Sequence, residues 1–99
     1  MFNSILVVCV GNICRSPTGE RLLKKYLPHK NIASAGINAL KGHAADATAV
    51  NAANEHQLSL DAHCAQQLTR DLCQQYDLIL VMEKRHIEAV CAISPSVRG

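Results

Sequence analysis

Two continuously apolar stretches constrain most strongly what this chain can fold into. Residues 5–10 (ILVVCV) and the run after Asp77 in residues 77–82 (DLILVM) show no polar alternation, which is typical of strands buried on both faces. A shorter strand is predicted over residues 31–35, closed by Gly36. Helices are predicted between and after these strands, from Ser16-Pro17 to Leu27, from Asp46 to about His56, from Thr69 to about Gln75 and from Glu83 to Ile93. Ser16, Asp46 and Thr69 are the expected caps, and the first helix is expected to have an apolar face of Leu22, Leu23, Tyr26 and Leu27.

Strands that alternate with helices predict an α/β fold. We expect a three-layer α/β/α arrangement around a central parallel sheet, with the strand at 5–10 in the middle. A chain of 99 residues allows a single domain, residues 1–99. In such sheets ligands bind beyond the carboxyl ends of the strands, so the loop after residues 5–10 is the first place to search for a site.

Composition excludes several classes of function. The net charge is only +2, the longest basic run is Lys24-Lys25 and aromatic residues make up 3%, which argues against nucleic-acid binding. The longest apolar stretch, six residues, is far too short to insert in a membrane. Without an export signal the expected location is cytoplasmic, and the five cysteines are expected to be thiols rather than disulfides.

Residues 9–16 (CVGNICRS) contain a cysteine, five further residues and then Arg-Ser, between a predicted strand and a predicted helix. A loop of this length can wrap a tetrahedral oxyanion with its backbone N–H groups pointing inward. Gly11 and Asn12 tolerate left-handed dihedral angles, and the helix N-terminus adds donors. Arg15 can hold two phosphoryl oxygens. The predicted phosphate-binding residues are Val10, Gly11, Asn12, Ile13, Cys14 and Arg15.

The same positive field favours a thiolate at Cys9, which would be a nucleophile for phosphoryl transfer. Ser16 is close enough in sequence to donate its hydroxyl to that sulfur. The alternative is that Cys9 is a buried, inert cysteine and Arg15 a surface residue. The strand before the loop, the Gly-Asn pair inside it and Ser-Pro after it favour the phosphate-binding interpretation.

Residues 5–18 (ILVVCVGNICRSPT) resemble the active-site segment of the low-molecular-weight protein tyrosine phosphatases. The resemblance covers essentially the whole chain. It continues through Ser34-Ala35-Gly36, Ala45-Asp46, His63 and residues 76–83 (YDLILVME). It is closest to the bacterial enzymes that accompany the tyrosine autokinases of capsule and exopolysaccharide export.

This resemblance implies a role for each matching residue. Cys9 would form a phosphocysteine intermediate, Arg15 would bind phosphate and Ser16 would support the thiolate. Cys14 would form a reversible disulfide with Cys9, which protects a low-pKa thiolate from irreversible oxidation. Braces of the loop would be Asn12, Ser34 and His63, and Leu40 would lie on the pocket rim. The implied substrate is a phosphotyrosine protein, most simply a tyrosine autokinase, and the product is inorganic phosphate, with no cofactor and no metal.

The chain also departs from the family pattern. The family's general acid is an aspartate in an Asp-Pro-Tyr segment, and this sequence contains no Asp-Pro. The last strand and the C-terminal helix of the family would lie beyond Gly99, so the chain resembles the N-terminal two-thirds of a phosphatase and is expected to be weakly active. Asp46 is expected to cap a helix, and Asp77 to point away from the catalytic edge.

Two alternatives stay open. An arsenate reductase would share the loop, but its relay needs two further cysteines where this chain has Met82 and Ala89. A non-catalytic phosphate-binding fragment is the other. Three more cysteines are interpreted as packing residues, and four histidines besides His63 as surface residues: Cys64, Cys73 and Cys91, and His29, His43, His56 and His86.

Overall fold

The computed structural model describes residues 3–82 and 85–94. Three parallel strands form one sheet: β1 (Ser4–Cys9), β2 (Asn31–Gly36) and β3 (Leu78–Val81). Their order is β2-β1-β3, and Val7 at the middle of β1 pairs with Ser34 on one side and Leu80 on the other. The predicted central position of the first strand is confirmed.

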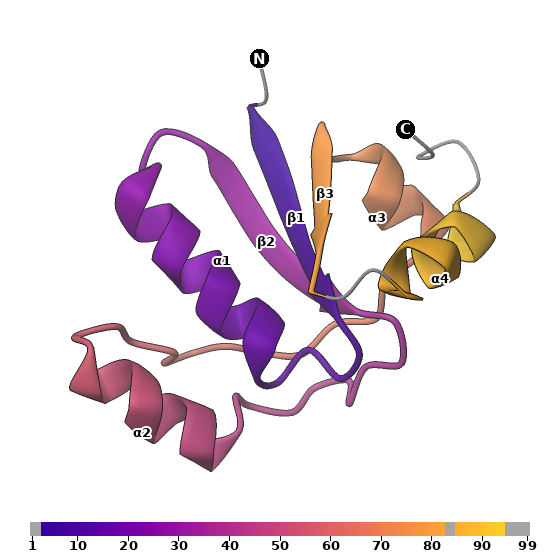
Figure 1. The fold of residues 1–99 in the computed structure, drawn as a ribbon. Helices are drawn as coiled ribbons and strands as arrows, with labels where there is room; N and C mark the ends of the chain where they lie inside the picture. The colour runs from indigo at the N-terminus through magenta and orange to yellow at the C-terminus, as the bar shows by residue number, and fades with distance from the viewer. Residues whose placement is uncertain (1–2, 83–84, 95–99) are drawn as a thin grey trace.

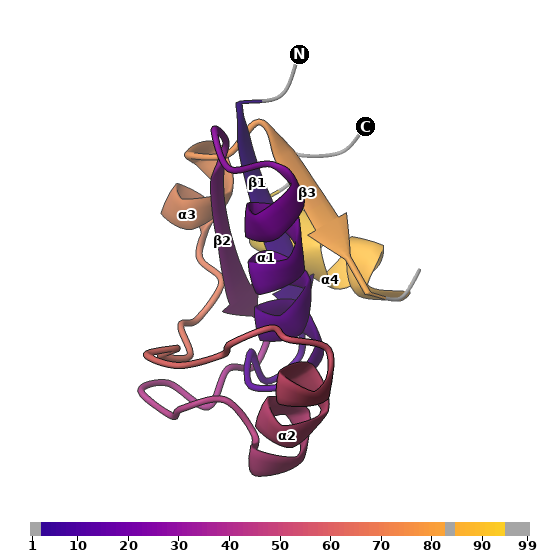
Figure 2. The ribbon, with the colours of Figure 1, turned by 90° about the vertical axis from the view of Figure 1, so that its left-hand side faces the viewer.

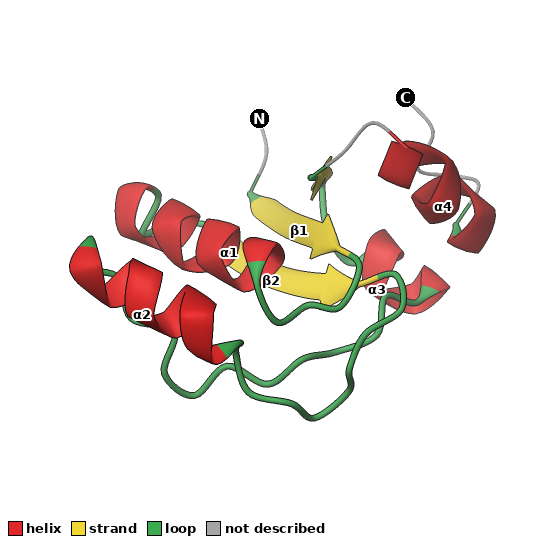
Figure 3. Ribbon diagram, turned by 60° about the horizontal axis from the view of Figure 1, so that its bottom comes forward, coloured by secondary structure: helices red, strands yellow, loops and turns green. Residues whose placement is uncertain are grey.

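The described residues form four helices: α1 (Arg15–Tyr26), α2 (Ala47–Glu55), α3 (Arg70–Gln74) and α4 (Arg85–Ile93). α1 covers one face, and α3 and α4 cover the other, which gives the predicted three layers (Figures 1 and 2). α2 lies beside α1, close to the loops that follow the strands (Figure 3). None of these helices is long and apolar enough to cross a membrane.

β1 supplies the core of both faces, as its sequence predicts. Ile5 and Val7 pack with Ile32 under α1, and Leu6 and Val8 pack on the opposite side with residues of α3 and α4. All five residues from Ile5 to Cys9 are buried. Burial on both faces explains why the run is uniformly apolar.

β3 is less buried than its sequence predicts. Its residues are half-buried, and Leu80 is 36% exposed. In the described part of the chain β3 pairs with β1 alone, so its other edge has no strand beside it. The expectation of a strand buried on both faces is therefore wrong for β3.

Two helix starts agree with their predicted caps, and one does not. Asp46 accepts hydrogen bonds from the backbone at Thr48 and Ala49, and Thr69 accepts one from Leu72. Ser16, expected to cap α1, lies inside the helix, which begins one residue earlier with no side-chain cap. The start of the fourth helix at Glu83 lies outside the described residues.

Some side chains expected in the core are exposed, and one expected at the surface is buried. The predicted apolar face of the first helix included Leu22 and Tyr26, but both are exposed, and only Leu23 and Leu27 pack against the sheet. Leu22 and Tyr26 instead line a groove of about 780 Å³ between α1 and α2. Two further predictions are wrong: His86 is buried, and Cys64 is exposed rather than packed in the core.

Candidate active site

The loop between β1 and α1, residues 10–14, lies at the carboxyl edge of the sheet, where its carbonyl groups point away from the loop centre. Each carbonyl oxygen from Cys9 to Cys14 accepts a hydrogen bond from outside residues 9–14. The pairs are Cys9 with Ile37 N (2.9 Å), Val10 with Asn38 N (2.9 Å), Gly11 with Leu40 N (3.1 Å), Asn12 with His63 Nε2 (2.6 Å), Ile13 with Asp46 N (2.7 Å) and Cys14 with Thr18 Oγ1 (2.8 Å).

The backbone N–H groups of this loop remain available as donors. Among the described residues, no backbone N–H of residues 10–14 donates a hydrogen bond to the protein. A curved run of backbone N–H groups is an anion-binding concavity, and the N-terminus of α1 adds its partial positive charge. The arrangement can therefore hold a phosphate or another oxyanion.

Asn12 fixes the curvature of the loop. It is fully buried and adopts the left-handed conformation, with φ 59°, which asparagine tolerates better than most residues. Its Nδ2 donates to Ser16 Oγ at 2.8 Å, and its Oδ1 accepts from the backbone N–H of Gln66 at 2.9 Å. Gly11, expected to share the left-handed conformation, does not adopt a positive φ.

Cys9 and Ser16 are in contact at the base of the loop. The Cys9 sulfur lies 2.8 Å from Ser16 Oγ, and both residues are buried. Because Ser16 Oγ already accepts a hydrogen bond from Asn12, its hydroxyl hydrogen is available to the sulfur. The geometry thus gives a sulfur anion at Cys9 a hydrogen-bond donor.

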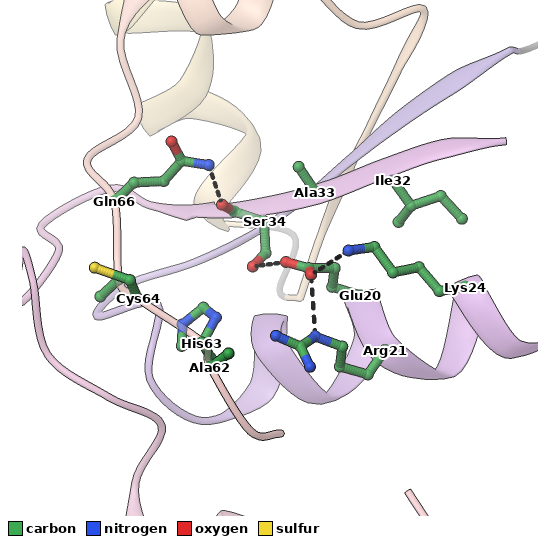
Figure 4. A pocket seen from close by; sticks show the side chains of 11 residues that line it. Glu20, Arg21, Lys24, Ile32, Ala33, Ser34, Ala62, His63, Cys64 and Gln66 are labelled. Atoms are coloured by element: carbon green, nitrogen blue, oxygen red, sulfur yellow. Dashed lines mark hydrogen bonds and ion pairs between the residues drawn. The ribbon is translucent and has the colours of Figure 1, made fainter. Parts of the chain in front are cut away.

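A second hydrogen-bonded group lies behind the loop, in a pocket of about 460 Å³ (Figure 4). Ser34 donates to Glu20 Oε1 at 2.5 Å, and Lys24 and Arg21 pair with Oε2 at 3.0 and 3.3 Å. Burial raises the pKa of the Glu20 carboxyl, but the hydrogen bond from Ser34 and the nearby cations outweigh burial and lower that pKa below its ordinary value. Gln66 Nε2 donates to the Ser34 carbonyl and joins this group to the loop.

Sequence reasoning missed three side chains near the site: Glu20, Gln66 and Gln67. Gln67 donates to the Ile37 carbonyl at 2.7 Å and accepts from Ala39 N at 2.9 Å. The available signals were weak. Glu20 is an acidic residue on the buried side of a helix, and the glutamines form a tandem pair in a segment without regular structure.

The remaining predicted residues lie in different parts of the fold. Arg15 begins α1 and is exposed, and Leu40 is 47% exposed at the segment that follows β2. Cys14 is an exposed free thiol, five residues from the buried free thiol of Cys9. Asp77 accepts from the backbone at Asn3 and Ser4, at the amino edge of the sheet, as expected. No cluster of three metal-ligating side chains occurs among residues 3–82 and 85–94.

Comparison with known proteins identifies the family. A model of the family described as low molecular weight phosphotyrosine protein phosphatase matches residues 4–99. The chain belongs to this family. It is 64% identical over 99 residues to the low molecular weight protein-tyrosine-phosphatase Wzb of Escherichia coli K12, and the match spans 100% of this chain and 67% of that protein.

Two solved structures agree. The tyrosine phosphatase AmsI of Erwinia amylovora is 68% identical and superposes with a TM-score of 0.98, over 100% of this chain and 66% of that one. Wzb of Vibrio vulnificus, in complex with benzylphosphonate, is 59% identical with a TM-score of 0.98, over 100% of this chain and 70% of that one. The chain thus spans about two thirds of the length of these relatives.

Proposed function

We propose that this chain hydrolyses phosphotyrosine through a phosphocysteine intermediate on Cys9. The observation that carries the proposal is the loop around that sulfur, in which every carbonyl from Cys9 to Cys14 is bonded outward. The Cys9 thiolate attacks phosphorus, a P–S bond forms and the P–O bond to tyrosine breaks. The departing phenolate takes a proton, and water then cleaves the P–S bond to release inorganic phosphate.

Some residues of the loop bind the phosphoryl group, and others activate the nucleophile or hold the loop in shape. The N–H groups of Val10, Gly11, Asn12, Ile13 and Cys14, with the guanidinium of Arg15, bind the three non-bridging oxygens and stabilise their charge as the transition state forms. Ser16 stabilises the thiolate. Asn12, Ser34 and His63 hold the loop in shape, and Leu40 contacts the substrate at the rim.

Protonation of the leaving group is the weak step in this chain. Asp46 is bonded to the loop through its backbone N–H, which donates to the Ile13 carbonyl. Its side chain is occupied as the cap of α2. We therefore infer that the 99-residue chain binds phosphate esters but turns over phosphotyrosine weakly.

The substrate class follows from the relatives. Wzb and AmsI are named protein-tyrosine-phosphatases, which supports a phosphotyrosine protein as substrate. Within that class we propose a tyrosine autokinase of polysaccharide export as the substrate. We also propose that this chain acts in the cytoplasm. Dephosphorylation of such a purified autokinase, followed with a phosphotyrosine antibody, tests this part separately.

The experiment for the proposed chemistry uses Cys9→Ser and Arg15→Lys. Cys9→Ser should abolish turnover of nitrophenyl phosphate and still bind inorganic phosphate. Arg15→Lys should be nearly as damaging, because an ammonium cannot reproduce the planar two-pronged contact. Cys64→Ser, which alters an exposed thiol outside the loop, is the matched control and should leave turnover unchanged. Turnover that survives Cys9→Ser would overturn the mechanism.

A further inference from the structure

Gln67 connects the candidate active site to the segment that borders it. We call residues 37–40 the rim segment. The Gln67 side chain spans this segment, since its Nε2 donates to the Ile37 carbonyl and its Oε1 accepts from Ala39 N. Its Nε2 also reaches the Leu68 carbonyl at 3.2 Å. One half-buried side chain thus uses both ends of its amide to shape a turn.

The rim segment is also bonded to the catalytic loop. Backbone N–H groups of Ile37, Asn38 and Leu40 donate to the carbonyls of Cys9, Val10 and Gly11. Gly36, at the start of this segment, approaches so closely that a Cβ there would collide with the Val10 carbonyl. The rim segment is therefore held from two sides, by the catalytic loop and by Gln67.

Gln66 and Gln67 hold different parts of the site. Gln66 donates its backbone N–H to Asn12 and its side chain to Ser34, so it supports the loop that surrounds the anion. No hydrogen bond in the described residues joins the Gln67 side chain to residues 9–16. Loss of the Gln67 amide should therefore disturb the rim and leave the anion-binding donors in place.

We propose that Gln67 is a positioning residue that sets Leu40 against the organic group of a bound phosphate ester. It thereby raises the affinity for aryl phosphates relative to inorganic phosphate. This inference rests on the proposed function and adds the residue that determines specificity for the ester group. Leu40 is suited to this contact because it is a large apolar side chain, about half exposed, on the segment that Gln67 fixes.

The test compares two ligands that share a phosphoryl-type head group. Inorganic phosphate needs only the loop, and benzylphosphonate adds an aromatic ring. We would measure both dissociation constants by titration of wild type and Gln67→Met, a change that keeps the length of the side chain and removes its hydrogen bonds. Loss of the Gln67 side-chain hydrogen bonds predicts about 3- to 10-fold weaker binding of benzylphosphonate, with phosphate binding changed by less than about 2-fold. Gln74→Met on the exposed side of α3 is the control and should change neither constant.

A double-mutant cycle with Leu40→Ala tests whether Gln67 acts through Leu40. Leu40→Ala should weaken benzylphosphonate alone, and adding Gln67→Met should cause little further loss, because coupled residues are not additive. Additive losses, or an unchanged ratio of the two constants in Gln67→Met, would overturn the inference while the proposed function stands. Should Gln67→Met not fold, Gln67→Glu removes the donor to the Ile37 and Leu68 carbonyls and keeps an acceptor for Ala39 N, and the ratio of constants cancels its charge effect. Wild type that binds neither ligand would overturn the proposed function, and this inference with it.

Discussion

At the scale of single residues, the family resemblance implies a reversible disulfide between Cys9 and Cys14, which are both free thiols in this structure. Cys14 is exposed where an oxidant can reach it, and Cys9 lies at the base of the same loop. Mild peroxide should join the two sulfurs and stop activity, and a thiol reductant should restore it. Peptide mapping of the oxidised protein measures the bond, with Cys64→Ser to exclude the other exposed thiol. Recovery of Cys9 only as sulfonic acid would contradict the prediction.

Glu20 predicts how stability depends on pH. Its pKa in the folded protein is below its ordinary value despite burial, so the unfolded chain binds the proton more readily. The stabilisation by Glu20 is therefore complete above the ordinary glutamate pKa of about 4.3 and is lost as the pH falls through the lower folded value. Glu20→Gln should lower the free energy of unfolding by about 1–2 kcal/mol at pH 7. The variant should also lose less of that free energy than wild type when the pH falls.

Urea unfolding at a series of pH values measures this effect. Glu55→Gln, on the exposed side of α2, is the matched control and should behave as wild type. A Glu20→Gln protein with the wild-type pH dependence would show that Lys24, Arg21 and Ser34 do not hold the carboxylate in solution.

How far the sequence predicts the site depends on the range of the contacts. The cysteine, the arginine and the serine lie within eight residues, and local rules for strand, turn and helix predict the loop between β1 and α1, although Ser16 lies inside α1 and does not cap it. Two partners of the loop carbonyls lie far away in the sequence, Asp46 33 positions from Ile13 and His63 51 positions from Asn12, and no local pattern marks them as partners. The family resemblance gave His63 a bracing role. It gave none to Gln67, whose partners are backbone groups that any sequence would offer.

At the scale of elements, β3 is the least protected strand. In the described residues its outer edge is unpaired, and it carries four apolar residues with no charge or proline to discourage pairing. The 99-residue chain should therefore associate with a second copy as its concentration rises. Leu80→Lys places a charge on this strand and should reduce association, as light scattering would show.

Ile87→Lys provides the control for this prediction. Ile87 is also an exposed apolar residue, but it belongs to α4 and not to the sheet. A similar effect of both substitutions would indicate a general gain in solubility. A wild-type chain that stays monomeric at high concentration would refute the role of the edge.

The unpaired edge of β3 also explains why its burial was predicted wrongly from the sequence. The pattern of β3 is as apolar as that of β1, so both are predicted to be buried on both faces. Burial of a strand depends on its neighbours in the sheet and on the helices above and below it, and these are properties of the assembled fold. For the same reason His86 is buried although histidine usually lies nearer the surface.

At the scale of the whole molecule, the expected activity depends on the leaving group. Tyrosine leaves as a phenolate with a pKa of about 10, and a positioned acid typically accelerates such a step by ~10²–10⁴-fold. Because the side chain of Asp46 is occupied as the cap of α2, this chain should be far slower on phosphotyrosine than E. coli Wzb. The two should differ much less on nitrophenyl phosphate, whose leaving group needs little protonation.

Single-turnover rates of both substrates on this chain and on E. coli Wzb measure the difference. Asp46→Asn is the informative variant, since Asp46 is bonded to the loop through its backbone. Equal phosphotyrosine rates for the two proteins would show that an acid lies within residues 1–99. A further loss in Asp46→Asn would then identify it.

The outward hydrogen bonds of the loop also set an order of events during synthesis. Cys9 leaves the ribosome early, but the groups that shape its loop arrive much later. The Asn12 side chain accepts a hydrogen bond from the backbone N–H of Gln66, which is 54 positions downstream. The Asn12 carbonyl accepts one from His63, which is 51 positions downstream. Until those residues emerge, Cys9 is an ordinary cysteine on a nascent chain, with no oriented donors around it. The loop therefore has all of these partners only after residue 66 has emerged, and a nascent chain stalled before residue 63 should carry a thiol that binds no phosphate.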